Sequence, residues 1–446
     1  MEIRDPIYGF ISINDFEKEI IDSPVFQRLR RIQTLGLTSM AYPGAVHTRF
    51  EHSLGVMHLA GLMYDAMTAP DRNQKILRYK LRHNKKRIEE DKQLVRIAAL
   101  LHDVGHGPFS HVAEEVMPYK KDQDTSSKKK KRFTHEDYTV AVINGPLKET
   151  IEDSQSNKFA IDAKQIAEVF ERGGRNAFWI KAIISSQLDA DRGDYLLRDS
   201  HHIGVKYGIY DHERLLNTLT LGQHPEEPQV AMLGVNREGL RVAESFVIAR
   251  YLEYTQVTFH KTRKAYDFHL EKAMKSILCC GLLPPPYKID QYLKYDDFTI
   301  FNQIKEKKDS NEDCLAIIDR KHIRCIHSET ARELNDVESR ERFEMAITEA
   351  REQLKQEGIT WSHVDRILAD WYRKKDYNEE ILIIDDKDPK KTPQLLSERS
   401  NIVNNIGCIA KWRLYVKLSE KEGAEIAWKK ITKEKKRKAP SKTLLS

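Results

Sequence analysis

The stretch Ala99-Leu-Leu-His-Asp-Val-Gly-His-Gly-Pro-Phe-Ser-His111 decides how this chain is interpreted. It places four side chains that can bind a metal or transfer a proton close together: His102, Asp103, His106 and His111. The apolar run that begins at Ile97 has helical spacing, and Gly105 and Gly107 end it, so the His-Asp pair lies at a helix terminus. Adjacent His and Asp side chains can face one ion at such a terminus. Mixed nitrogen and oxygen donors suit Mn, Fe, Mg or Zn better than a thiolate zinc site.

Two further segments can complete a single metal centre. Arg49-Phe-Glu-His52 opens an apolar helical pattern, and Asp189-Ala-Asp-Arg-Gly-Asp-Tyr-Leu-Leu-Arg-Asp199 concentrates carboxylates on another. A histidine from the first segment and a carboxylate from the second would add to His102 and Asp103. The sequence therefore predicts a mononuclear centre built from three distant parts of the chain.

The composition is that of a folded, polar protein with more than one domain. The chain has 446 residues, of which 40% are hydrophobic and 32% charged. Helical spacing dominates residues 1–280, and Pro284-Pro-Pro286 within 281–290 favours an extended connector. We therefore expect a mainly α fold, in which a helical domain over 1–280 is followed by a smaller α+β C-terminal lobe over 291–432.

The secondary structure expected in the C-terminal lobe is mixed. Short β-prone runs lie at 314–318, 323–326, 381–384 and 412–418. Residues 336–358 predict an amphipathic helix with Phe343, Ile347, Ala350 and Leu354 on one stripe. Residues 433–446 are basic and poor in apolar side chains, which predicts a disordered tail.

Net charge is +6, and much of the excess lies in the runs 128–132 and 429–442. The first run belongs to a basic loop near 120–132. Both runs are interpreted as solvated segments, with nucleic acid as the alternative partner. The longest apolar runs are too short to span a membrane and the first residues lack a signal-peptide pattern, so we expect a cytoplasmic protein.

The ordered set of one His, then His-Asp, then Asp resembles the HD-domain phosphohydrolase superfamily. Within it, the chain is similar to the deoxynucleoside triphosphate triphosphohydrolases of the SAM-and-HD-domain type and their bacterial relatives, without a SAM domain in this sequence. The resemblance runs from about residue 5 to 211 and continues more weakly to about 270. It implies four metal ligands: His52, His102, Asp103 and Asp191. Asp189 and Asp194 are the alternative carboxylates.

The resemblance also implies the reaction. In these enzymes a metal-bound water attacks the α-phosphorus of a (deoxy)nucleoside triphosphate and releases nucleoside and triphosphate. His111 and Glu114 match the catalytic His-acid pair, and their i,i+3 spacing places them on one helix face. The residues that match phosphate contacts are Arg49, His106, His135, Arg192 and Tyr195. Asp199 and Tyr266 match residues that hold the sugar.

One departure affects substrate choice. Thr34 stands where well-studied members carry a Gln that binds the sugar 3′-hydroxyl, whereas Leu35 keeps the apolar contact beneath C2′. Preference for deoxyribose is therefore expected to depend on Leu35, and Thr34 contacts the sugar through water or not at all.

A second similarity to the family concerns regulation. Asp22, Gln27 and Arg30 match residues that hold a guanine nucleotide between subunits in tetrameric members, which implies a nucleotide effector and a homo-oligomer, dimer or tetramer. The alternative is that these residues cap and brace a helix.

Three functions remain open from the sequence. The first is metal-dependent triphosphohydrolysis of dNTPs. The second is an HD-type phosphodiesterase or nuclease acting on single-stranded or cyclic nucleotides. The third is a nucleotide-sensing binding or scaffold protein, which the complete ligand set argues against.

Overall fold

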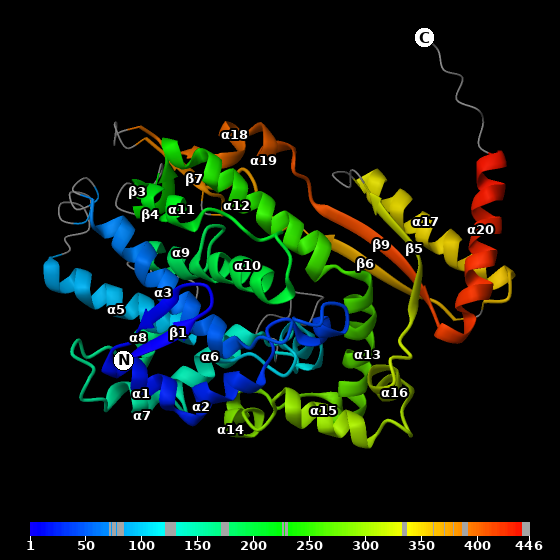
Figure 1. Ribbon diagram of the computed structural model, residues 1–446, viewed down its shortest axis with the longest axis horizontal. Coiled ribbons are helices and arrows are strands. Elements are labelled where there is room, and N and C mark those ends of the chain that lie inside the picture. Colours follow the sequence, from blue (N-terminus) through cyan, green and yellow to red (C-terminus); the bar gives the residue numbers. More distant parts are fainter. Residues whose placement is uncertain are drawn as a thin grey trace, which may run out of the picture. The chain divides into compact units, whose positions relative to one another are not determined.

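The computed structural model describes residues 1–70, 73, 77, 84–120, 131–170, 178–224, 227, 231–331, 337–359, 361–369, 371–377, 379–385 and 391–438 (Figure 1). Two compact units are formed, and their segments alternate along the chain. Unit 1 comprises 1–257, 274–303 and 372–406, and unit 2 comprises 258–273, 304–371 and 407–446. The connector expected at 281–290 lies within unit 1, so the division does not follow the single boundary that the prolines predict.

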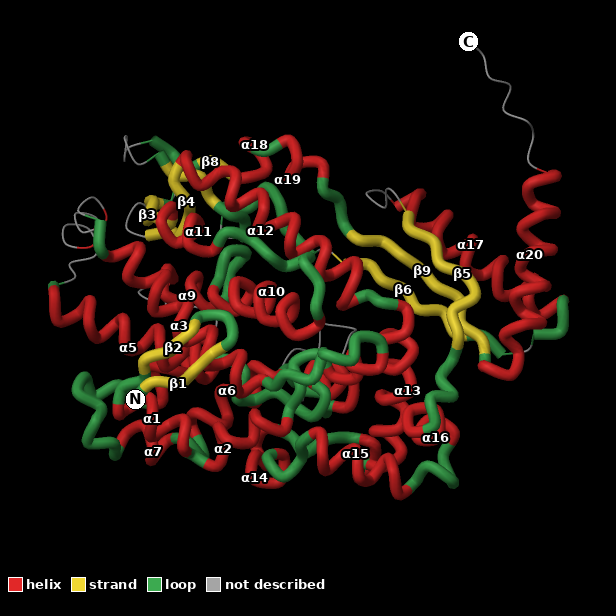
Figure 2. Tube along the Cα trace, in the orientation of Figure 1, coloured by secondary structure: helices red, strands yellow, loops and turns green. Residues whose placement is uncertain are grey.

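Unit 1 is mainly helical, as Figure 2 shows, and the mainly α class with a separate α+β part is confirmed. Its helices are α1 (Asp15–Asp22), α2 (Pro24–Gln27), η1 (Arg28–Arg31), η2 (Gly36–Met40), α3 (Arg49–Thr68), α5 (Lys85–Leu101), η4 (Ser110–Val116), α6 (His135–Asn144), α7 (Lys148–Glu152), α8 (Ala163–Phe170), α9 (Phe178–Ile184), α10 (Ala190–Ile203), α11 (His212–Thr218), η6 (Arg237–Gly239), α12 (Leu240–Glu253), η8 (Cys279–Gly281), η9 (Pro286–Lys288), α14 (Ile289–Tyr292), α18 (Leu396–Arg399) and α19 (Asn401–Asn405).

Helix α3 is the central element of unit 1 and packs against α5 and α10 (Figure 1). Fifteen of its 20 residues are buried, on every side of the helix. Apolar burial all round is typical of a core helix. Its N-terminus is fixed by a capping box in which Thr48 and Glu51 satisfy each other's backbone N–H groups. This box sets the position of the first turn, which carries His52.

Helix α5 begins earlier than the sequence indicates. Asn84 is its N-cap and accepts from the backbone N–H of Arg87, whereas Asp91 lies inside the helix. Asp91 pairs with Arg87 one turn earlier. The end of the helix is as predicted, with His102 as its C-cap.

Unit 1 also contains two small sheets. Strands β1 (Glu2–Asp5) and β2 (Gly9–Ser12) form an antiparallel hairpin. The second sheet has the order β3-β4-β7-β8, from β3 (Leu219–Gln223), β4 (Ala231–Asn236), β7 (Leu382–Ile384) and β8 (Gln394–Leu395). Strand β7 pairs parallel with β4, with Gly234 opposite Leu382. The strand predicted at 381–384 therefore joins the first unit and not the C-terminal lobe.

Unit 2 is the α+β part. Its sheet has the order β5-β9-β6, from β5 (Arg324–Ala331), β9 (Ile409–Val416) and β6 (His363–Ala369), with antiparallel pairing. Helices α16 (Glu312–Ile318), α17 (Val337–Gln356), η10 (Leu418–Glu420) and α20 (Lys421–Lys438) belong to it. The π-helix η7 (Tyr254–Thr258) and helices α13 (Lys261–Ile277) and α15 (Asp297–Glu306) run across unit boundaries.

The core of unit 2 lies between β9, α17 and α20. Ile347, Ala350 and Leu354 of α17 pack with Trp412 and Leu414 of β9 in this cluster. These are the predicted stripe residues, except that the side chain of Phe343 lies outside the described part. The helix predicted at 336–358 is thus confirmed as α17.

Two other predictions in this region were wrong in detail. Residues 314–318 lie in helix α16 and not in a strand, because Asn311 caps the backbone N–H groups of Asp313 and Cys314. The tail expected to be disordered from 433 is helical as far as Lys438, since α20 continues through it. Residues 439–446, and 121–130 of the basic loop, lie outside the described residues.

Candidate metal centre and catalytic site

Three elements bring the predicted ligands together. His52 comes from the first turn of α3, His102 and Asp103 from the end of α5, and Asp191 from the first turn of α10. His52 Nε2 lies 3.1 Å from Asp191 Oδ1 and 3.6 Å from Asp103 Oδ2. His102 Nε2 lies 3.3 Å from Asp103 Oδ1 and 3.7 Å from Asp191 Oδ1. The two nitrogens and the two carboxylates therefore face one point.

The two alternative carboxylates have other partners. Asp189 is the N-cap of α10 and accepts from the backbone N–H groups of Arg192 at 2.8 Å and Ser186 at 2.7 Å. Asp194 lies behind the ring of His52, 2.8 Å from Nδ1. Of the three carboxylates, only Asp191 thus faces the Nε2 atoms of both His52 and His102 in this arrangement.

The residues present fit a divalent ion. The candidate ligand atoms of His52, His102 and Asp103 lie within 4.8 Å of one another, and all three side chains are almost wholly buried. His102 donates through Nδ1 to the carbonyl of Ala99 at 2.8 Å, which leaves Nε2 free of hydrogen bonds within the described part of the chain. A buried, oriented imidazole nitrogen beside two carboxylates is a typical divalent-ion donor set.

Electrostatics hold the carboxylates ionised. Burial opposes ionisation of Asp103, but the Arg49 guanidinium, which contacts it directly, and the neighbouring imidazoles hold its pKa well below the usual range. Burial also opposes protonation of His52, but hydrogen bonds to Asp191 and Asp194 raise its pKa to about 10. Asp103 therefore stays ionised, as a carboxylate that binds a cation must be.

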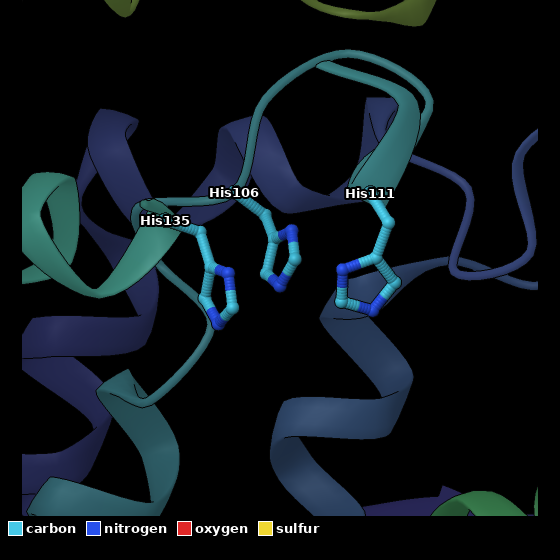
Figure 3. A group of neighbouring side chains, drawn as sticks. All are labelled: His106, His111 and His135. Carbon is cyan, nitrogen blue, oxygen red and sulfur yellow. The ribbon is translucent and has the colours of Figure 1, made fainter. Parts of the chain in front are cut away.

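His106, His111 and His135 form a second cluster (Figure 3). It adjoins the first, because His106 Nε2 lies 3.3 Å from Asp103 Oδ1. The rings of His106 and His135 are stacked, with centroids 3.9 Å apart and planes at 16°, and His111 meets both edge-on. Imidazole donates to a metal within its ring plane, so two stacked rings in parallel planes cannot both point at one ion. This arrangement suits phosphate oxygens and proton transfer better than a second metal.

Glu114 links two of these histidines. Its Oε1 atom lies 2.6 Å from His135 Nδ1 and 3.4 Å from His111 Nδ1. Burial opposes ionisation, but the hydrogen bonds to both imidazoles lower the pKa of Glu114 below its usual range. The i,i+3 contact predicted between His111 and Glu114 is present on η4, and His135 is an additional and closer partner of the same carboxylate.

The other predicted phosphate contacts surround these clusters. Arg49 is buried, contacts Asp103, and donates through Nε to Ser110 Oγ at 2.9 Å. His106 Nε2 lies 3.3 Å from Asp103 Oδ1, and burial together with Arg49 and His135 holds the His106 pKa well below its usual range. Arg192 pairs with Asp189. Tyr195 lies on α10, four residues after Asp191, and burial raises its pKa.

The predicted sugar contacts are divided between the units. Thr34 donates its hydroxyl to the His47 carbonyl at 3.3 Å, and Leu35 follows it. Asp199 is buried, with Oδ1 2.7 Å from His47 Nε2. Tyr266 belongs to unit 2, where it is buried against the ring of His322 at 4.4 Å. The structure therefore groups Thr34, Leu35 and Asp199 around the His47 segment.

The residues matched to an effector site make local contacts. Asp22 pairs with Lys18 one turn earlier. Gln27 donates to the Ile21 carbonyl at 2.8 Å and accepts from Arg30 Nε at 2.8 Å. The N-cap of α2 is Ser23 and not Asp22. Bracing of the α1–α2 turn accounts for these contacts.

Two family models match the chain. Residues 49–199 match the HD domain, and residues 210–422 match the HD associated region. The first match encloses His52, His102, Asp103 and Asp191. The chain therefore contains an HD domain followed by an HD associated region, and it resembles the HD-domain phosphohydrolases of the SAMHD1 type.

Individual relatives agree with this placement. The chain is 32% identical over 277 residues to the uncharacterized protein YwfO of Bacillus subtilis, covering 61% of this chain and 54% of that protein. It is 32% identical over 301 residues to the deoxynucleoside triphosphate triphosphohydrolase SAMHD1 homolog of Dictyostelium discoideum, covering 66% and 50%. The chain thus spans about half the length of the curated relatives it matches.

A solved structure extends the similarity over almost the whole chain. A hypothetical protein from Aquifex aeolicus superposes with a TM-score of 0.74 at 26% identity, covering 96% of this chain and 99% of that one.

No helix among the described residues is long and apolar enough to cross a membrane.

Sequence reasoning missed several residues that support the site. Asp194 was treated as a rival ligand, whereas it orients His52 and pairs with Arg198, which also binds Asp5 at 2.9 Å. Ser110 and Asp297 hold the loop after the His-Asp pair. Their partners lie far away in sequence, so no local pattern could reveal them.

Proposed function

We propose that this protein hydrolyses deoxynucleoside triphosphates to nucleoside and triphosphate. The observation that carries the proposal is the adjacency of two chemically different clusters. A cation-binding set of His52, His102, Asp103 and Asp191 lies beside a proton-transfer set linked through Glu114. The relatives named as deoxynucleoside triphosphate triphosphohydrolases support the choice of substrate.

A divalent ion held by the first set, whether Mn, Mg, Fe or Zn, would supply Lewis-acid chemistry and a better water nucleophile. The second set belongs to the chain itself. His111 directs Nδ1 at Glu114, which leaves Nε2 to hold the proton that the departing 5′ oxygen requires. His135 shares the same carboxylate, so Glu114 can stabilise a protonated imidazole on either residue.

Phosphate binding follows from the charges around these sets. Arg49 and Arg192 carry guanidinium groups that can form fork-like hydrogen bonds with phosphate oxygens. Both pair with carboxylates here, through Asp103 and Asp189 respectively. A triphosphate would therefore exchange carboxylate contacts for phosphate contacts at these side chains.

Leu35 and Thr34 are proposed to lie along the sugar and Asp199 to contact it, whereas Tyr266 belongs to unit 2 and is not assigned to this group. The same resemblance extends the proposal to a homo-oligomer with a nucleotide effector at Asp22, Gln27 and Arg30. Nucleic acid at the basic segments belongs to the phosphodiesterase or nuclease alternative.

The test is a product analysis of the full chain with a panel of NTPs, dNTPs and a single-stranded oligonucleotide, in the presence of each metal. Hydrolysis in ¹⁸O-labelled water should place the label in triphosphate and none in the nucleoside, because attack at the α-phosphorus breaks the bond to the 5′ oxygen. Asp103→Ala should abolish turnover, whereas Asp153→Ala at an exposed site should not. Release of monophosphate or cleavage of the oligonucleotide would favour the phosphodiesterase or nuclease alternative.

A further inference from the structure

We propose that Asp297 is a positioning residue that holds the sugar-side segment and the proton-transfer segment of the site in register. The proposal rests on the function proposed above, which assigns Thr34 and Leu35 to the sugar and His111 to proton transfer. Asp297 lies about 190 residues from the second segment in sequence, at the start of α15.

The contacts are made by both carboxylate oxygens. Oδ2 accepts from the backbone N–H of Gln33 at 2.9 Å, and Oδ1 accepts from the backbone N–H of Phe109 at 2.7 Å. The residue is 5% exposed. One buried side chain thus joins the backbone immediately before Thr34 to the backbone two residues before His111.

The segment that Asp297 holds has an unusual backbone. Phe109 and Ser110 are both left-handed, with φ of 56° and 60°, and neither is glycine. Side-chain-bearing residues rarely adopt this conformation, and two in succession need support from outside the turn. Gly36, with φ of 52°, allows the turn to come close, since a Cβ there would lie 3.1 Å from the Phe109 carbonyl oxygen.

A second side chain makes the same connection. Ser110 donates its hydroxyl to the Gln33 carbonyl at 2.6 Å and accepts from Arg49 Nε at 2.9 Å. The peptide groups around Gln33 are therefore held from both sides, by Asp297 at N–H and by Ser110 at C=O. Asp297 and Ser110 thus form a clamp on Gln33. Arg49 connects this clamp to Asp103, which belongs to the proposed metal-binding set.

Ordinary core packing would not require a carboxylate here. Burial raises the pKa of Asp297 to about 7, although the two N–H donors favour its ionised form. An apolar side chain would be easier to bury, but it could not accept two hydrogen bonds that diverge to two segments. The two hydrogen bonds that align the Gln33 and Phe109 segments therefore explain why a carboxylate is buried here.

The neighbouring Asp296 provides a matched control. Its Oδ2 atom pairs with Arg31 Nε at 2.5 Å, and its Oδ1 atom caps α15 at the Thr299 N–H at 2.8 Å. It contacts neither the Gln33 nor the Phe109 N–H group. Asp296→Asn and Asp297→Asn make the same substitution one residue apart, and only the second places an amide NH₂ against a backbone N–H.

The experiment compares these two variants of the full chain in three measurements. Hydrogen exchange should accelerate at least tenfold in Asp297→Asn at whichever of the Gln33 and Phe109 amides loses its acceptor, and it should remain unchanged at both amides in Asp296→Asn. The kcat for dNTPs should fall about tenfold or more in Asp297→Asn, and the preference for dNTPs over NTPs should narrow, with metal content retained. If Asp297→Asn does not fold, Asp297→Ser keeps one acceptor and serves instead.

Unchanged exchange at both amides would overturn the clamp, whatever the activity. Accelerated exchange with kcat and substrate preference equal to those of Asp296→Asn would overturn its positioning role. If the wild-type chain hydrolyses no dNTP, the proposed function fails and the positioning role fails with it, while the exchange data still decide whether the clamp exists.

Discussion

His52 Nδ1 lies 2.8 Å from Asp194 Oδ2, while the opposite ring nitrogen, Nε2, faces Asp191 at 3.1 Å. A histidine that binds a metal through one nitrogen usually donates its other N–H to a carboxylate or carbonyl, which fixes the tautomer and the ring orientation. Asp194 is in turn held by Arg198 at 2.8 and 2.9 Å. The His52 ring is thus oriented by a buried chain of charges.

We expect Asp194→Asn to weaken divalent metal affinity by about 10- to 100-fold, since loss of such an orienting carboxylate costs that much. Metal content after dialysis against a graded chelator measures the change. Asp153→Asn, at an exposed position in the same unit, is the control. Unaltered affinity in Asp194→Asn, with a folded chain by circular dichroism, would show that His52 does not depend on Asp194.

Gly55→Ala should disrupt the same buried pair of Asp194 and Arg198. A Cβ at this position would lie 2.0 Å from Asp194 Oδ1 and 2.3 Å from Arg198 Nη2, both fully buried. Overpacking of this kind costs about 1–3 kcal/mol, and we expect that loss of stability together with weakened metal binding. Gly61→Ala on the same helix is the matched control, because its Cβ would meet the flexible Arg96 side chain, at 2.9 Å from Nη1 and 3.4 Å from Cδ and Cγ. Equal melting temperatures for the two variants would contradict the expectation.

The parts of the structure that could be predicted are those set by local pattern. The break after Leu101 could be predicted because Gly105 and Gly107 follow the apolar run closely, whereas single glycines such as Gly55 and Gly61 lie inside α3. Residues 314–318 were misassigned because a short apolar run does not distinguish strand from helix, and the deciding signal was the Asn311 cap. The role of Asp194 depends on a partner 142 residues away and could not be predicted.

The proton-transfer set leads to a third prediction. His111→Ala should lower turnover by about 10²-fold with metal retained, as general acid catalysis is typically worth that much. Because Glu114 contacts His135 as well, Glu114→Gln should reduce turnover by a similar factor, and combining it with His111→Ala should add little further loss. Single-turnover rates with metal content measured on the same samples decide this. A His111→Ala enzyme as fast as wild type would remove His111 from the site.

The stability of unit 2 should depend on pH through His363. Burial, together with Lys272, lowers its pKa to about 4 against the ring of Phe268, whose centroid is 4.2 Å away. The unfolded chain takes up this proton near pH 6.5, so stability is lost as the pH falls from about 6.5 towards 4. The expected loss at pH 5 is below about 2 kcal/mol, because solvent screens a side chain that is only partly buried.

Denaturant unfolding at pH 7 and pH 5, followed by tryptophan fluorescence, measures this term. His363→Phe should reduce the difference between the two pH values. His322, whose pKa is also lowered to about 4, keeps a second contribution in both proteins. The same difference in wild type and His363→Phe would exclude His363 as a source of the dependence.

The substrate prediction depends on the Thr34–Leu35 pair. If Leu35 lies against C2′, a ribose hydroxyl there would be desolvated without a partner, at a cost of roughly 1–3 kcal/mol. We therefore expect dNTPs to be preferred over NTPs by about one to two decades in kcat/KM, and Leu35→Ala to narrow that ratio. Thr34 donates its hydroxyl to the His47 carbonyl and does not offer that proton to the sugar. Thr34→Gln should therefore tighten the binding of sugars with a free 3′-hydroxyl.

The buried Leu37, two residues further on in η2, gives the matched control. Leu37→Ala removes the same atoms from the core, so it should lower stability and leave the ratio of dGTP to GTP turnover unchanged. Competition between dGTP and GTP in one reaction measures the ratio of their turnover independently of the enzyme concentration. Equal turnover of the two nucleotides by wild type, with no response to Leu35→Ala, would contradict the assigned position of the sugar. It would also favour a phosphodiesterase or nuclease, because such an enzyme can select a nucleic-acid substrate by its phosphate backbone and not by one face of a single ribose.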